Sequence, residues 1–145
     1  MTKIMVINGP NLNMLGIREP DVYGSETLQD LEAYIESYAE KKGVEVICMQ
    51  SNSEGDIIDY IHYAFSNCQG IVINPAAYTH YSYAIFDALK AVSLPAVEVH
   101  ISDIESREEF RKISVTAPAC IKQIKGYGFD GYLMAIDTLI EKIEG

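Results

Sequence analysis

The sequence predicts an α/β protein built on a doubly wound parallel sheet. Short apolar runs alternate with stretches that carry apolar residues at helical spacing along almost the whole chain. Such runs suit strands that are buried on both faces, and their alternation with helices is typical of parallel sheets. Small polar or ionisable residues follow each of the first four apolar runs at once. Because ligands bind at the carboxyl ends of the strands in such sheets, this pattern predicts a small-molecule site.

The first two pairs of strand and helix are expected before Gly70. A strand at residues 4–7 leads through a long loop to a helix that ends near Gly43. That helix carries apolar residues at helical intervals, namely Leu28, Leu31, Ile35 and Tyr38. A second strand at residues 46–50 leads to a helix whose predicted buried face consists of Ile57, Ile58, Ile61 and Phe65.

Three more strands complete the predicted sheet, at residues 71–73, at residues 96–99 and around residues 120–124. The helix after the third strand has as its apolar positions Ala84, Ile85, Ala88 and Leu89. A charged stretch follows the fourth strand, and the last helix carries Leu133, Ile136, Leu139, Ile140 and Ile143. We therefore expect residues 1–145 to form a single catalytic domain, with a five-stranded parallel sheet of flavodoxin-like type and helices on both faces.

Composition and charge exclude several classes of function. The formal net charge of −10, from 21 acidic and 11 basic residues, argues against nucleic acid and acidic membrane surfaces as partners. No apolar stretch approaches the roughly 20 residues that span a bilayer, and the first strand begins too early for a signal peptide, so we expect a cytoplasmic protein. The spacing of the cysteines favours reduced thiols over a disulfide or a zinc site, with a catalytic thiol as the alternative; they are Cys48, Cys68 and Cys120.

The run from Gly126 to Gly131 fits the pattern G-x-G-x-x-G of dinucleotide-binding loops. That fingerprint needs a following strand and an acidic residue about 20 positions on. Only 14 residues follow Gly131, so a turn at the start of a helix explains the glycines better. We therefore expect no nucleotide cofactor.

Polar residues at four strand ends outline the predicted pocket: Asn8 to Asn11, Asn52, Asn74, and His100 to Ser102. Three arginines fall beside these ends, and arginine suits bidentate recognition of a carboxylate. They are Arg18, Arg107 and Arg111. The alternative is that each arginine pairs with an acidic neighbour such as Glu19, Glu105 or Glu108.

The loop at residues 8–25 is long for a connection between a strand and a helix, and long loops at a binding face often act as lids. It carries Arg18 and Tyr23. A nearby guanidinium favours the charged form of a phenol and lowers a pKa that is about 10 in free tyrosine. Arg18 would then make Tyr23 a usable base; the alternative is a packing or cation–π contact.

Two of the three histidines follow apolar runs on the predicted site face. Strand alternation places Glu98 and His100 on one side, where the carboxylate can orient the imidazole and raise its basicity. That pair suits general acid catalysis, with a purely structural pairing as the alternative. His80 also falls on this face, whereas His62 lies within a helix, where a surface or packing role is expected. No third ligand with credible spacing indicates a metal.

Four runs of residues resemble those of the type II 3-dehydroquinate dehydratases. The first is Asn8-Gly9-Pro10-Asn11-Leu12 with Arg18-Glu19-Pro20 and Tyr23-Gly24, and the second is Gln50-Ser51-Asn52-Ser53-Glu54-Gly55. The third is Asn74-Pro75-Ala76-Ala77-Tyr78-Thr79-His80, and the fourth is Val97-Glu98-Val99-His100-Ile101-Ser102 with Arg107-Glu108-Glu109-Phe110-Arg111. The resemblance covers essentially the whole chain. One departure is Ala76, where the family commonly has glycine, which puts the local backbone geometry in question.

The resemblance implies reversible trans-dehydration of 3-dehydroquinate to 3-dehydroshikimate in the shikimate route to aromatic compounds, through an enolate and without a Schiff base or cofactor. It implies that Tyr23, activated by Arg18, removes the proton next to the ketone. Asn11 would help to hold a water that stabilises the enolate oxygen, and His100, held by Glu98, would protonate the departing hydroxyl.

The same resemblance assigns substrate contacts and an assembly. Asn74, His80 and Arg111 match positions that contact substrate, and Ile101-Ser102 matches the segment that receives its carboxylate. Arg107 would set the charge around Tyr23. Asp87 matches a residue that reaches the site of a neighbouring subunit, and the family is typically a homododecamer built as a tetramer of trimers.

Two other classes of protein are alternatives to this resemblance. A flavodoxin-like small-molecule binding module, such as an FMN electron carrier, would use the same crevice, but the first loop lacks a Ser/Thr-rich phosphate cradle. A receiver-type regulatory module would need acidic residues at the strand ends to hold magnesium, where this chain has Asn, His and Arg.

Overall fold

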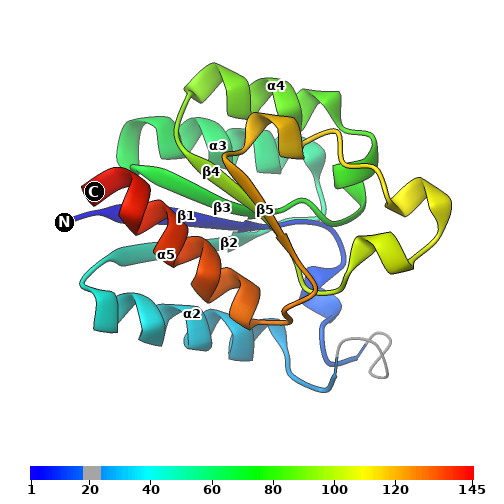
Figure 1. Ribbon diagram of the computed structural model, residues 1–145, viewed down its shortest axis with the longest axis horizontal. Helices are drawn as coiled ribbons and strands as arrows, with labels where there is room; N and C mark the ends of the chain where they lie inside the picture. The colour runs from blue at the N-terminus through cyan, green and yellow to red at the C-terminus, as the bar shows by residue number, and fades with distance from the viewer. Residues whose placement is uncertain (18–23) are drawn as a thin grey trace.

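The computed structural model describes residues 1–17 and 24–145. Its sheet consists of the parallel strands β1 (Lys3–Asn8), β2 (Glu45–Gln50), β3 (Gly70–Asn74), β4 (Ala96–His100) and β5 (Lys122–Lys125). The helices of the described residues are α2 (Leu28–Lys42), α3 (Glu54–Asn67), α4 (Tyr83–Val92) and α5 (Asp130–Glu144) (Figure 1). The strand order β2-β1-β3-β4-β5 is that of the flavodoxin-like fold, so the predicted fold class is confirmed.

Two apolar layers enclose the sheet, with α2 and α5 on one face and α3 and α4 on the other (Figure 1). Alternation along β1 divides its side chains between them: Ile4 and Val6 pack with α2 and α5, and Met5 and Ile7 pack with α3 and α4. Because the central strands are buried on both faces, they read in the sequence as continuous apolar runs.

Hydroxyl side chains begin three of the helices. Thr27 forms a capping box with Asp30 at the start of α2, while Ser53 and Ser82 accept a backbone N–H at the starts of α3 and α4. Gly43 ends α2 in a left-handed conformation, as the sequence predicts. No helix in the described part of the chain is long and apolar enough to cross a membrane.

Three details of the predicted elements were wrong. Phe65 is 62% exposed and Ala84 is exposed, because the inward positions of α3 continue from Ile61 to Ala64 and those of α4 begin at Ile85. The fifth strand starts at Lys122 rather than Cys120, after a 3-10 turn at Ala117–Ala119.

The turn predicted at Gly126 and Gly128 is confirmed, since both residues have positive φ just before α5.

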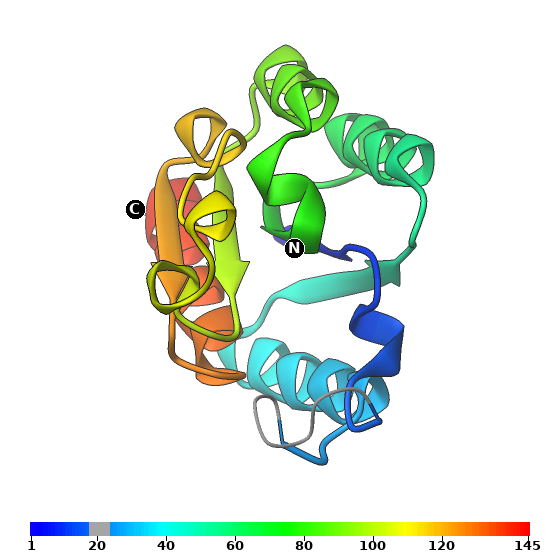
Figure 2. The same ribbon diagram turned by 90° about the vertical axis from the view of Figure 1, so that its right-hand side faces the viewer.

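The strand order reverses between β1 and β3, and the carboxyl ends of these two strands lie side by side. Asn8 and Asn74 are partners in the register, and Gly9 donates its N–H to the carbonyl of Asn74 at 2.8 Å. A Cβ at Gly9 would lie 2.6 Å from the carbonyl oxygen of Pro75, so this crossing requires glycine. Figure 2 faces this edge of the sheet, where ligands bind in such folds.

Ala76 has a φ of 56°, in the left-handed region that favours glycine. Its N–H donates to Oδ1 of Asn74 at 3.1 Å, which fixes this turn directly after β3. The alanine therefore keeps the local geometry at the cost of backbone strain.

Ala76→Gly is therefore expected to raise the free energy of unfolding by about 1 kcal/mol, because glycine adopts this conformation without steric cost. Urea denaturation measures the change. Ala77→Gly is the matched control: Ala77 does not have positive φ, so glycine there is expected to lower stability. Equal loss of stability in both variants would contradict the strain at Ala76.

Candidate active site

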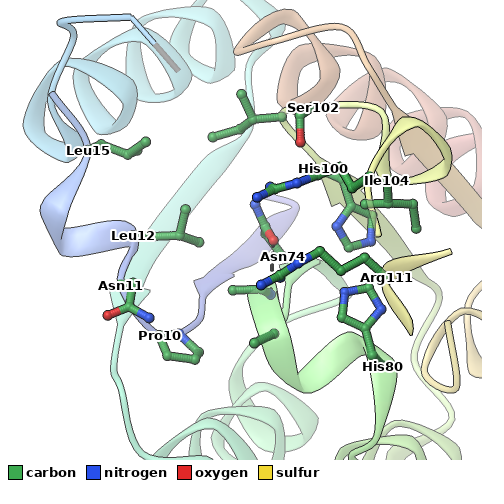
Figure 3. Close-up of a pocket in the computed structure, with 14 residues that line it drawn as sticks. Pro10, Asn11, Leu12, Leu15, Asn74, His80, His100, Ser102, Ile104 and Arg111 are labelled. Atoms are coloured by element: carbon green, nitrogen blue, oxygen red, sulfur yellow. Dashed lines mark hydrogen bonds between the residues drawn. The ribbon is translucent and has the colours of Figure 1, made fainter. Parts of the chain in front are cut away.

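A cavity of about 120 Å³ opens at the carboxyl ends of β1, β3 and β4 (Figure 3). Predicted site residues that line it are Asn11, Asn74, His80, His100, Ile101, Ser102, Arg107 and Arg111. The sequence analysis assigned no role in the site to the remaining lining residues, which are Pro10, Leu12, Leu15, Ala76, Ala77 and Ile104. One side of the cavity carries Pro10, Asn11, Leu12 and Leu15, and the opposite side carries the two histidines with Arg111, Ser102 and Ile104 (Figure 3).

Glu98 and His100 form a hydrogen-bonded pair at the end of β4. Nε2 of His100 lies 2.9 Å from Oε2 of Glu98, and the two side chains are 6% and 0% exposed. A carboxylate accepts, so Nε2 carries the proton and Nδ1 is the ring nitrogen left for the pocket. The predicted pairing across alternate strand positions is confirmed.

Three further side chains donate to the carboxylate of Glu98. Ser114 Oγ and Gln123 Nε2 donate to Oε2 at 2.8 Å each, and Thr116 Oγ1 donates to Oε1. Burial alone raises the pKa of Glu98, but the hydrogen bonds and charge of His100, with the bonds from Thr116 and Gln123, lower that pKa overall. Glu98 is therefore held as an anion behind the imidazole.

The lowered pKa of Glu98 makes stability depend on pH. The unfolded chain takes up a proton at Glu98 near the ordinary pKa of 4.5, while the folded chain stays ionised to lower pH. The stabilisation is thus present above pH 4.5 and is lost as the pH falls through the folded pKa.

In Glu98→Gln the free energy of unfolding is expected to fall less steeply with decreasing pH than in the wild type, because the titrating group is gone. Urea denaturation at a series of acidic pH values measures the slope. Glu40→Gln, which removes an exposed carboxylate on α2, is the control. A Glu98→Gln slope as steep as that of the wild type would show that Glu98 does not carry this dependence.

His80 is held by the segment that follows the arginines. Its Nδ1 lies 2.8 Å from the carbonyl oxygen of Ile113, which accepts, so Nδ1 is the donor. The neutral ring then presents Nε2 as an acceptor. The side chain reaches the pocket from the 3-10 helix Ala76–His80 and points toward Arg111 in Figure 3.

Asn11 has φ of 70° and lines the pocket from the first loop. Its N–H donates to Oδ1 of Asn52 at 2.9 Å, and Gln50 Nε2 donates to the same oxygen at 3.1 Å. The predicted place of Asn52 on the pocket edge was wrong, because its side chain turns to hold the Asn11 loop instead. The end of β2 therefore supports the site without lining it.

Arg107 and Arg111 give the pocket a positive charge within an acidic protein. Arg111 Nε donates to Oε2 of Glu108 at 2.9 Å, while its guanidinium points into the cavity beside His100 (Figure 3). Arg111 thus pairs with its acidic neighbour and also lines the pocket, and its recognition of a carboxylate stays a prediction. None of the described residues that line the cavity is acidic, which suits an anionic ligand.

Four predicted site residues do not appear among the described residues that line this pocket, and one of them, Glu98, is buried behind His100. Arg18 and Tyr23 lie outside the described residues. Asp87 is exposed on α4 and does not line the cavity, so its assignment to the site of a neighbouring copy stays a prediction. Of the two roles expected for His62, the structure shows the surface position, since the residue is exposed on α3.

The arrangement offers proton transfer and anion binding. A buried carboxylate orients one imidazole, a second imidazole presents an acceptor, and two guanidiniums supply positive charge. Among the described residues, no group of three His, Cys, Asp or Glu side chains comes together in a way that would hold a metal ion. These groups suit acid and base catalysis on a small carboxylate.

Comparison with known proteins matches the chain along almost its whole length. The family model described as dehydroquinase class II matches residues 2–140. The 3-dehydroquinate dehydratase of Clostridium perfringens is 59% identical over 143 residues, which cover 98% of this chain and 99% of that protein.

Solved structures agree with the sequence comparison. The crystal structure of the type II dehydroquinase of Butyrivibrio crossotus has a TM-score of 0.94 and 59% identity, over 95% of this chain and 97% of that one. The type II dehydroquinase of Propionibacterium acnes has a TM-score of 0.93 and 43% identity, over 97% of each chain.

Proposed function

This chain belongs to the class II dehydroquinase family and is a 3-dehydroquinate dehydratase of type II, and from that premise we propose how it performs the reaction. The proposal is trans-dehydration of 3-dehydroquinate to 3-dehydroshikimate through an enolate, with Tyr23 as base and His100 as general acid. The observation that carries it is the buried Glu98 carboxylate bound to His100, beside a pocket with two arginines.

In the first step Tyr23, as phenolate, takes a proton from the carbon next to the ketone, and the electron pair moves onto the carbonyl oxygen. Arg18 favours the charged phenol, and Arg107 adds positive charge around it. Support for this role comes from the sequence neighbourhood, because Arg18 follows the pocket-lining Leu15 by three positions. Asn11 holds a water that donates to the enolate oxygen.

In the second step the enolate collapses. The bond between carbon and the hydroxyl oxygen breaks, a double bond conjugated with the ketone forms, and His100 gives its proton so that the hydroxyl leaves as water. Glu98 stabilises the imidazolium before the transfer and holds the ring in place. Exchange with solvent then removes the proton from Tyr23 and restores the one on His100.

The remaining lining residues hold the substrate. The carboxylate binds at Ile101 and Ser102, and Asn74, His80 and Arg111 contact the rest of the molecule. In the proposed homododecamer, Asp87 of one copy, which is exposed on α4, completes the site of its neighbour.

Ultraviolet absorbance after addition of 3-dehydroquinate tests the activity, because the product contains a conjugated enone and the substrate does not. The expected result is a saturable rise in absorbance, with a product that has lost one water by mass spectrometry. A folded protein that binds 3-dehydroquinate without a rise in absorbance would contradict the proposal and favour the binding module.

A further inference from the structure

One buried polar group stands outside the mechanism described above. Tyr132 is fully buried beneath the pocket on α5, where the neighbouring inward positions are the apolar Ala135, Ile136 and Leu139. Burial raises the pKa of this phenol, so the hydroxyl stays neutral and offers one donor together with acceptor sites. Burying a hydroxyl costs free energy unless it forms hydrogen bonds, so the partners of this group show what it holds in place.

The two hydrogen-bond partners of the Tyr132 hydroxyl lie where the strand order reverses. It donates to Oδ1 of Asn8 at 2.6 Å and accepts from Nδ2 of Asn74 at 3.0 Å. These asparagines are register partners at the carboxyl ends of β1 and β3. Asn74 lines the pocket, whereas Tyr132 does not.

The contacts of Asn74 fix its carboxamide in one orientation. Its Oδ1 accepts the N–H of Ala76 at 3.1 Å, and one hydrogen of Nδ2 points to Tyr132. The second hydrogen of Nδ2 is then the donor that remains for a ligand in the pocket. A rotation of the amide by a half turn would set Nδ2 against the N–H of Ala76 and is therefore disfavoured.

Asn8 depends on the same hydroxyl. Its side chain is fully buried, and its Nδ2 has no hydrogen-bond partner among the residues described. The bond from Tyr132 to Oδ1 is thus the contact that orients this amide. The hydroxyl ties the two central strands to α5 at the floor of the pocket.

We propose that Tyr132 is a positioning residue of the reaction, whose hydroxyl orients the Asn74 carboxamide so that its remaining N–H meets the substrate. The inference rests on the proposed function, in which Asn74 contacts substrate. Tyr132 itself touches no substrate. Removing its hydroxyl leaves Nδ2 of Asn74 without its buried acceptor, so that the bond from the N–H of Ala76 must orient the amide without the second anchor.

Tyr132→Phe is the first test, because phenylalanine keeps the ring in the core and removes only the hydroxyl. KM is expected to rise by about tenfold and kcat to change much less. The reason is that the substitution removes a buried hydrogen bond that orients a group that binds the substrate. Tyr38→Phe is the matched control: that hydroxyl also bonds to α5, at Asp137, but at the surface and away from the pocket. It is expected to leave KM and kcat unchanged.

The two variants separate positioning from plain stability. A Tyr132→Phe variant that melts at a lower temperature yet keeps the wild-type KM would show a structural role alone and overturn the inference. If Tyr132→Phe does not fold, Asn8→Ala carries the test, because it removes the acceptor that directs the hydroxyl. That variant is expected to raise KM by a smaller factor, and an unchanged KM would overturn the inference.

A double-mutant cycle with Asn74→Ala completes the test. If Tyr132 acts through Asn74, adding Tyr132→Phe to Asn74→Ala leaves kcat/KM where Asn74→Ala had already put it. Multiplied effects of the two substitutions would overturn the inference and leave the proposed function intact. An Asn74→Ala variant with unchanged kcat/KM would overturn the substrate role of Asn74 and this inference with it.

Discussion

Tyr23→Phe is expected to lower kcat by about a thousandfold while KM changes only a few fold. General bases contribute roughly 10² to 10⁴ in rate, and a phenyl ring keeps the shape of the side chain without a group that takes up a proton. The substitution removes an interaction that is made only in the transition state, so kcat and kcat/KM should drop together. Steady-state kinetics by product absorbance measures both.

Tyr127→Phe is the matched control for this prediction, since Tyr127 is an exposed tyrosine in the turn before α5 that does not line the cavity. Its kinetics should equal those of the wild type. A Tyr23→Phe enzyme that retains near-normal kcat would remove Tyr23 from the mechanism and direct attention to the two pocket histidines as bases.

His100→Ala is expected to lower kcat by roughly a hundredfold or more, because it removes the imidazole that gives its proton to the departing hydroxyl. The first step should survive, since it needs only Tyr23. In heavy water, the variant is therefore expected to incorporate deuterium at the carbon next to the ketone faster than it forms product. Mass spectrometry of recovered 3-dehydroquinate measures the exchange.

His62→Ala is the control, because it removes an exposed imidazole from α3. It should behave as the wild type in both assays. If exchange and product formation fall equally in a folded His100→Ala protein, His100 serves the proton abstraction or substrate binding and is not the general acid of the second step.

Local patterns predicted the sheet and much of the pocket. Apolar runs marked the strands because these are buried on both faces, and the polar residues after β1, β3 and β4 meet at one edge. The pairing of Glu98 with His100 followed from alternation along one strand. These features depend on residues close together in the sequence, so a short pattern contains them.

Contacts between distant elements lay beyond those patterns. The donors to Glu98 other than His100 lie 16 to 25 positions away on the chain, and nothing local marks Thr116 or Gln123 as partners of a carboxylate. Tyr132 falls among the apolar positions of a helix and reads as a core residue, although its hydroxyl lies against β1 and β3. Asn52 follows its strand as the polar residues of the pocket follow theirs, so the sequence did not distinguish it from them. However, β2 lies at the edge of the sheet, and the side chain of Asn52 supports the first loop.

The central claim is that proton transfer by side chains carries the reaction, with an enolate and no covalent imine. Treatment of the enzyme with borohydride in the presence of 3-dehydroquinate tests it most directly, because borohydride reduces an imine to a stable adduct. The account predicts an unchanged rate of absorbance increase after the reagent is removed, and an unchanged mass of the protein. Loss of activity together with a mass gain on a lysine would contradict the account.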